Sequence, residues 1–212
     1  DAYTSGAEAA QYTDLGDGDV TIFYDDPKDT FTYTAAIKTT GDIAKVDGPT
    51  TFQGNVSASS FASDFDTDNF GSNSLTTTGN VTLGGAMTVG TLTVGGNLET
   101  SSHNLTASGD VSVTGTTNTL SGTISVDGNF TSTGAFTKTA GTLTFKKNAT
   151  FTAGATLTAG TNTVTNTLTI GAATTQAAGS TTAGALTANG NFSVSGGSLT
   201  VRGLTTVNGV EV

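Results

Sequence analysis

Two clusters of aspartates near the start of the chain are the residues whose type and spacing come closest to a metal site. The first places carboxylates at alternate positions, as the first half of a calcium-binding loop does, and the second gathers them around two glycines. The first departs from the loop pattern, since Leu75 stands where the loop needs a Glu and Gly71 comes two positions late. Solvated loop acids give the same pattern. Calcium is the one cofactor that we consider, and its candidate ligands are Asp64, Asp66, Asp68, Asp14, Asp17 and Asp19.

Residues that could perform catalysis are scarce. The chain has no cysteine, which excludes disulfides and thiol chemistry, and its one histidine, His103, lies in a turn-like SSHN sequence with only Glu99 near it as an acid. Parallel β-helix enzymes that cleave polysaccharides cluster carboxylates with a basic residue on one outer face. Asp110 and Asp127 are 17 residues apart, with no Arg or Lys expected in register. We therefore predict that the protein is not an enzyme.

The elements that position these residues follow from apolar residues that return every 19 positions. Each unit holds three short segments in which one polar residue separates two inward-facing ones, with turn residues between segments. Such units bury a core only by stacking on their neighbours. The sequence thus predicts an all-β fold, a β-solenoid with three short strands per coil of about 19 residues. The columns are Leu92, Val111, Phe130, Ala149 and Leu168; Leu105, Ile124 and Leu143; and Leu98, Thr117, Phe136 and Ala155.

Polar residues flank the inward ones, and the pleat of a strand places them on the outer face. The side chains become smaller between Ala172 and Ala188, where we expect the register to slip and the coil either to pack less firmly or to contain a bulge. The predicted outward stacks are Thr93, Ser112, Thr131, Thr150 and Thr169; Thr106, Ser125, Thr144 and Thr163; and Asp110, Asn129 and Asn148.

Residues 1–70 differ in composition from the rest of the chain. They hold 13 of the 17 acidic residues, all four tyrosines and six of the eleven phenylalanines. We interpret them as a small N-terminal β cap or docking module, with an arm and then a hairpin formed by residues 20–24 and 30–37. The coil is expected to start near Phe52, and residues 71–212 form the Thr-, Gly- and Asn-rich solenoid shaft.

Composition also bounds the partners and the location. Seven Lys and Arg residues against 17 acidic ones cannot follow a phosphate backbone, so nucleic-acid binding is not expected. No apolar run reaches the length of a membrane span. The chain begins at Asp1 and not Met, which fits either removal of a secretion signal or a sequence trimmed before Asp1. We expect an extracellular protein, secreted or on the cell surface, with the virion surface as the alternative.

The run GNVTLGGAMTVGTLTVGGNLET and its echoes GNFTSTG and GNFSVSGGSLTVRG resemble the shaft repeats of phage tail fibres and of secreted bacterial β-solenoid surface proteins. The resemblance covers about residues 79–212. It implies a fibrous component of a cell or virion surface, in which the shaft is a spacer and recognition takes place at one end.

The leading functional hypothesis is a structural subunit of an extracellular filament or virion appendage that self-assembles end to end by β-strand addition. Its partners are other copies of itself, with a surface glycan or host receptor as a further candidate. The alternatives are a trimeric phage-type fibre shaft or adhesin, and an ice-binding solenoid, because Thr-x-Thr ranks resemble the ice-binding face of some antifreeze proteins. The residues predicted to assemble are Val20, Ile22, Tyr24, Leu204, Val207, Val210 and Val212.

Overall fold

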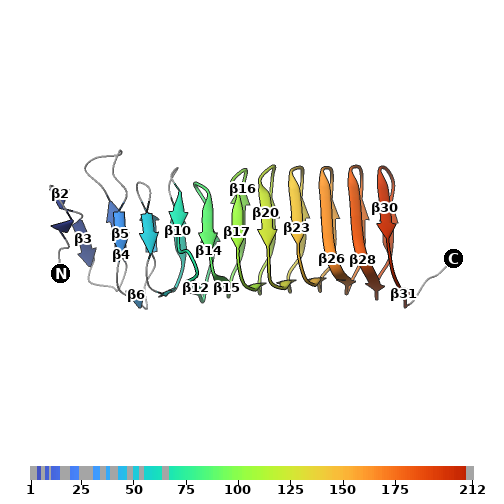
Figure 1. Cartoon of the computed structure of the whole chain (residues 1–212), viewed down its shortest axis with the longest axis horizontal. Coiled ribbons are helices and arrows are strands. Elements are labelled where there is room, and N and C mark those ends of the chain that lie inside the picture. Colours follow the sequence, from blue (N-terminus) through green and yellow to red (C-terminus); the bar gives the residue numbers. More distant parts are fainter. Residues whose placement is uncertain are drawn as a thin grey trace.

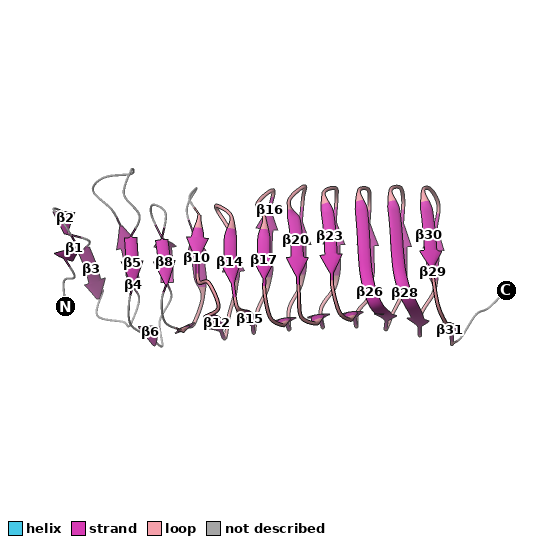
Figure 2. Cartoon of the chain, viewed as in Figure 1, coloured by secondary structure: helices cyan, strands magenta, loops and turns pink. Residues whose placement is uncertain are grey.

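The computed structural model describes the backbone of strand residues 4–5, 8–9, 11–14, 20–23, 31–33, 37–38 and 43–46, and of residues 50–52, 55–63 and 67–208. Side chains are described at Ile43 and throughout the last three of these ranges. All regular elements in this part of the chain are β-strands, and none is a helix (Figure 2). From β4 onward the strands follow one another along an elongated rod (Figure 1). The all-β prediction is confirmed.

Three faces run along the rod, each built from one strand per coil paired in parallel with the strands before and after it. Face 1 is an 11-stranded sheet that also includes β3 (Gln11–Asp14). Its remaining strands are β4 (Val20–Phe23), β7 (Ile43–Val46), β10 (Phe61–Ser63), β13 (Val81–Thr82), β16 (Leu98–Ser101), β19 (Thr117–Thr119), β22 (Phe136–Lys138), β25 (Ala155–Leu157), β27 (Thr174–Gln176) and β29 (Phe192–Val194).

Faces 2 and 3 together form an 18-stranded sheet, because two long strands run through both. Face 2 consists of β5 (Phe31–Tyr33), β8 (Thr50–Phe52), β11 (Asp68–Asn69), β14 (Met87–Val89), β17 (Leu105–Ala107), β20 (Thr123–Val126), β23 (Thr142–Phe145), the first halves of β26 (Thr161–Ile170) and β28 (Ser180–Ala188), and β30 (Ser198–Val201). Face 3 consists of β6 (Ile37–Lys38), β9 (Val56–Ala58), β12 (Ser74–Thr77), β15 (Thr91–Val94), β18 (Val111–Val113), β21 (Phe130–Ser132), β24 (Ala149–Phe151), the second halves of β26 and β28, and β31 (Thr205–Val207).

The register confirms all three inward columns. On face 3, Leu92 lies beside Val111, and the column continues through Phe130, Ala149 and Leu168. The second column lies on face 2 and the third on face 1. All members of these columns are buried. A one-residue slip would turn every one of them outward, and this is why the 19-residue period specifies the register so strongly.

Aromatic rings fill the core at two places along the rod. Phe130 stacks on Phe145 of face 2 with ring centroids 4.7 Å apart, and Phe136 and Phe151 complete this cluster at centroid distances of 5.7 and 5.9 Å from Phe130. A second cluster joins Phe52, Phe61 and Phe70. Rings from different faces therefore meet on the axis and hold the faces together.

The N-terminal part differs from the prediction in two ways. The expected hairpin of residues 20–24 with 30–37 is wrong, because β4 pairs antiparallel with β3 and parallel with β7, while β5 pairs in parallel with β8 on another face. The parallel stacking also begins at β4 and not near Phe52. β4 and β5 therefore lie on different faces of the coil, where sequence alone suggested two neighbouring strands of one sheet. β1 (Thr4–Ser5) and β2 (Glu8–Ala9) form a separate antiparallel pair.

The expected slip in register near the C-terminal end is confirmed. Between β26 and β28 the pairing shifts after Val164, so that Thr161 lies beside Ser180 but Thr167 lies beside Ala185. Gly184 thus stands opposite two residues of the previous coil, which is the arrangement of a β-bulge.

Candidate functional site

Only one of the six candidate calcium ligands has a described side chain. Asp68 is buried in β11, between Thr50 of β8 and Met87 of β14, and its neighbours Thr67 and Asn69 are exposed. Asp14 belongs to β3, where only the backbone is described, and Asp64, Asp66, Asp17 and Asp19 lie outside the described residues. The described residues include no group of three or more His, Cys, Asp or Glu suited to a metal ion. Calcium binding stays a prediction.

Asp110, Asp127 and His103 occupy corners of the coil, whereas Glu99 lies within β16. The backbone N–H of His103 donates to the carbonyl of Thr100 at 2.9 Å, within the turn after β16. Asp127 forms an ion pair with Lys146 at 2.8 Å, and both side chains are largely exposed. The expectation that no basic residue stands in register with Asp127 is therefore wrong, because Lys146 follows it by one 19-residue coil. Such an exposed pair contributes at most about 1 kcal/mol to stability.

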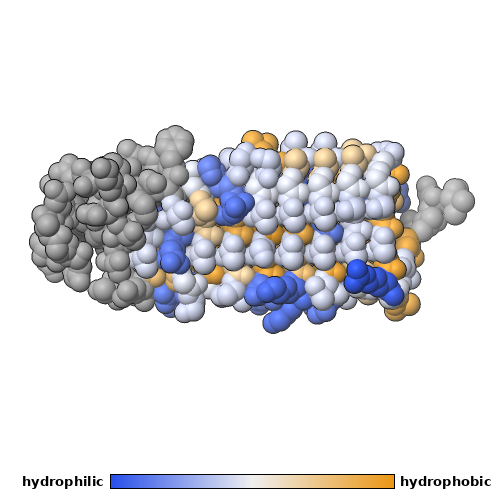
Figure 3. Space-filling view, turned by 45° about the horizontal axis from the view of Figure 1, so that its top comes forward, coloured by the Kyte–Doolittle hydropathy of each residue, from blue (hydrophilic) through white to orange (hydrophobic). Residues whose placement is uncertain are grey.

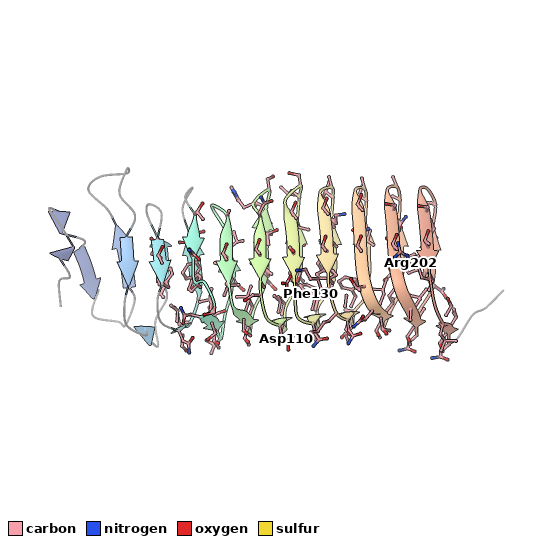
Figure 4. All side chains as sticks on the ribbon, in the orientation of Figure 1. Asp110, Phe130 and Arg202 are labelled. Carbon is pink, nitrogen blue, oxygen red and sulfur yellow. The ribbon has the colours of Figure 1, made fainter. Side chains whose placement is uncertain are left out.

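A polar ladder occupies the corner before face 3, as the stack of Asp110, Asn129 and Asn148 predicted (Figure 4 labels Asp110). Asp110 Oδ1 accepts a hydrogen bond from the backbone N–H of Asn129 at 2.7 Å. Asn129 Oδ1 accepts from the backbone N–H of Asn148 at 3.4 Å and from Asn148 Nδ2 at 3.1 Å. Asn148 Oδ1 then accepts from the N–H of Thr167 at 3.2 Å. Each side chain satisfies a backbone donor one coil further on, so these residues are explained by the fold itself.

A buried polar network in the last third of the rod was missed by the sequence analysis. The Lys138 ammonium donates to Asn162 Oδ1 at 2.7 Å and to the carbonyls of Ala159 and Thr161 at 3.0 and 3.3 Å. Asn162 Nδ2 donates to Thr181 Oγ1, whose hydroxyl donates to Gln176 Oε1 at 2.6 Å.

All three ammonium protons have acceptors, although Lys138 is fully buried. Burial lowers the pKa of Lys138 to about 8. One signal in the sequence could have revealed the network. The inward column that holds Leu143 continues in the next two coils with the polar residues Asn162 and Thr181.

Within the described residues, the core is uncovered at its C-terminal end. The inward side chains of the last coil remain partly exposed, among them Val194 at 39% and Val207 at 47%, while Leu204 at the adjoining corner is 76% exposed. Val194 and Val207 border a hollow of about 480 Å³. Figure 3 shows the hydrophobic colour at this end of the rod. The hollow is lined by Leu186, Ala188, Asn191, Phe192, Val194, Leu199, Thr205 and Val207.

The predicted assembly residues fall partly at this open end. Leu204 and Val207 lie there, while Val210 and Val212 lie outside the described residues, as does Tyr24 at the other end. Val20 and Ile22 belong to β4, whose two edges are already paired with β3 and β7. Among the described strands, those with one partner at the N-terminal end are the separate pair β1 and β2, together with β3, β5 and β6.

Two adjacent columns of hydroxyl side chains cover face 2 from β20 to β30. Strand pairing places them in line from coil to coil, and no charged residue occupies an outward position in these five strands. We call this surface the hydroxyl grid. One column is Thr123, Thr142, Thr161, Ser180 and Ser198, and the other is Ser125, Thr144, Thr163, Thr182 and Thr200.

Comparisons with known proteins returned no match, whether with family models, with curated proteins or with solved structures. The resemblance to fibre shafts thus stays a prediction. No helix of the length and hydropathy needed to cross a membrane occurs in the described ranges.

Proposed function

We propose that the protein is a structural subunit of an extracellular filament or virion appendage, in which the solenoid is a stiff spacer and successive copies associate end to end. The single observation that supports this most is the open C-terminal end of the core. Apolar side chains that earlier coils bury completely are partly exposed there, around the hollow next to Phe192. Covering apolar surface is favourable by about 25 cal/mol per Å², so this end favours a partner that continues the coil.

The unpaired edges at the two ends are compatible in direction. On faces 2 and 3 every described pairing is parallel, and β30 and β31 end the stacks that β5 and β6 begin. A second copy placed head to tail would bring its β5 and β6 against β30 and β31 and extend both faces in the same direction. A contact of this kind uses different surfaces on the two copies and does not close, so it generates a filament.

Core closure by one chain favours this arrangement over a trimeric shaft with a shared core. Phe130 packs against Phe136 and Phe145, so residues from all three faces of the same chain meet on the axis. Nothing in these coils requires two further chains to complete the interior. The proposal includes two predictions: the filament lies on a cell or virion surface, and its further partner is a surface glycan or a host receptor.

Charge placed at the open end tests the proposal. Val194→Lys puts an ammonium among the side chains that line the hollow, whereas Ser193→Lys puts the same charge on the outward side of the same strand. We expect the wild type and Ser193→Lys to form filaments as concentration rises. Val194→Lys should weaken association at least about tenfold, or about 1.4 kcal/mol, because the ammonium must be desolvated.

Sedimentation velocity and negative-stain electron microscopy over a concentration series give the readout. Discrete rods of the wild type at every concentration would contradict end-to-end assembly, as would unchanged filaments of Val194→Lys. A species with the mass of three chains that persists at high dilution would establish the trimeric fibre shaft in its place.

A further inference from the structure

The hydroxyl grid on face 2 is regular in two directions, along the rod and across the face. A stack of polar side chains on a twisted or interrupted surface lacks this regularity. The strands β20, β23, β26, β28 and β30 lie side by side along the rod (Figure 1), and their pairing keeps residue beside residue. Adjacent rows are therefore about 4.8 Å apart, and the two columns are about 6.7 Å apart, as strand geometry dictates. The grid is a fixed two-dimensional lattice of hydroxyl groups.

The grid is also chemically uniform and stiff. Seven of its ten members are threonine, whose β-branched side chain has few rotamers, so each hydroxyl and methyl group is held in place. Asp110, Asn129 and Asn148 belong to the corner ladder before face 3 and do not interrupt the grid. Charged residues follow face 2 at the corner of the coil, where Asp127 and Lys146 pair with each other and Lys147 and Arg202 also lie.

A ligand for such a surface must repeat in two dimensions and be uncharged. Water in ice meets both conditions: with O–H···O distances of about 2.75 Å and tetrahedral angles, second-neighbour oxygens lie about 4.5 Å apart. This differs from the strand spacing by about 0.3 Å, so the mismatch over four steps stays near 1 Å. In the other direction the grid has only two columns, a single step of about 6.7 Å, so no mismatch accumulates over several steps. Fixed hydroxyls can hold water at lattice positions, and the methyl groups between them leave no competing charge to disorder it.

From this match we propose that face 2, between β20 and β30, is an ice-binding surface. The proposal is independent of end-to-end assembly, since the grid lies along the side of the rod and the open core lies at its end. Each can fail without the other.

The test measures thermal hysteresis and ice shaping by the purified protein, together with the uptake of the fluorescently labelled protein into a growing ice hemisphere. Thr163→Lys changes the middle row of the grid, where Thr163 lies between Thr144 and Thr182. Thr156→Lys is the matched control, because Thr156 is an exposed outward threonine between Thr137 and Thr175 on face 1.

We expect the wild type and Thr156→Lys to shape ice crystals and to show a hysteresis gap, and Thr163→Lys to lose most of that gap with an unchanged β signal in circular dichroism. Three results would overturn the proposal: no gap and no uptake of the wild type, an equal gap in both variants, or binding to microcrystalline cellulose or chitin powder without any effect on ice.

Discussion

Gly160→Ala is the substitution that examines the corners of the coil most sharply. Gly160 lies between β25 and β26 with φ of +87°, in the left-handed region that favours glycine. A Cβ atom added there would collide with the carbonyl oxygen of Gly141, one coil before, and would lie 2.9 Å from Lys138 Nζ. The same carbonyl accepts the N–H of Thr161 at 3.2 Å, so it cannot move without loosening that hydrogen bond.

The expected loss of stability is the sum of two effects. The left-handed conformation costs an alanine about 1–2 kcal/mol, and the displaced carbonyl and its hydrogen bond add about 1–2 kcal/mol. Gly71→Ala isolates the first effect, because Gly71 has φ of +56° with open space around the added Cβ. Reduced freedom of the unfolded chain offsets part of the cost in both variants and so cancels in the comparison. Gly160→Ala should therefore destabilise the protein by about 1–2 kcal/mol more than Gly71→Ala.

Thermal unfolding followed by far-ultraviolet circular dichroism measures the difference. For a chain of this size about 1 kcal/mol corresponds to about 2–4 °C, so the melting temperature of Gly160→Ala should lie about 2–8 °C below that of Gly71→Ala. Equal melting temperatures would refute the close approach of consecutive corners on which the stacking depends.

Three further substitutions test the core and the charges. Phe130→Ala removes the ring that contacts Phe136, Phe145 and Phe151 and should lower the free energy of unfolding by about 3–5 kcal/mol in urea titrations, whereas a loss below about 1 kcal/mol would contradict its central place. The pKa of Lys138 is about 8 in the folded protein against 10.5 as its ordinary value, so the unfolded state binds more protons between these values and stability should rise as pH increases from about 8 to 10.5. Lys138→Met should remove that rise, and an unchanged pH profile in the variant would show that Lys138 does not cause it. Lys146→Ala breaks an exposed ion pair and should change the free energy of unfolding by less than about 1 kcal/mol, with a larger loss contradicting that assignment.

The period of the inward residues predicted the shaft because two independent constraints agree there. Side chains alternate between the two sides of a strand, and stacked coils require inward residues to stand beside each other, so Leu92, Val111 and Phe130 had one consistent register. The N-terminal coils were misread because one strand, a short turn and another strand fit a hairpin as well as a solenoid corner. The pairings of β4 with β7 and of β5 with β8, each with a strand of the next coil, separate the two.

Candidate sites were harder to predict than the fold, since they depend on which columns become neighbours. The 19-residue period predicted the column that contains Thr163. It did not predict that the column containing Thr161 lies next to it on the same face, or that Asn148 lies on a corner. The pair of Asp127 and Lys146 was within reach, because one coil separates them. The buried position of Lys138 was not expected, since a lysine is rarely fully buried.

Cryo-electron microscopy of the protein at high concentration tests the central claim most directly, because it resolves the strand spacing along an assembled filament. The account predicts long filaments in which the spacing of about 4.8 Å continues across the joint between copies, with β30 and β31 of one copy followed by β5 and β6 of the next. Rods of one chain length, or filaments whose strand spacing is interrupted at each joint, would contradict it.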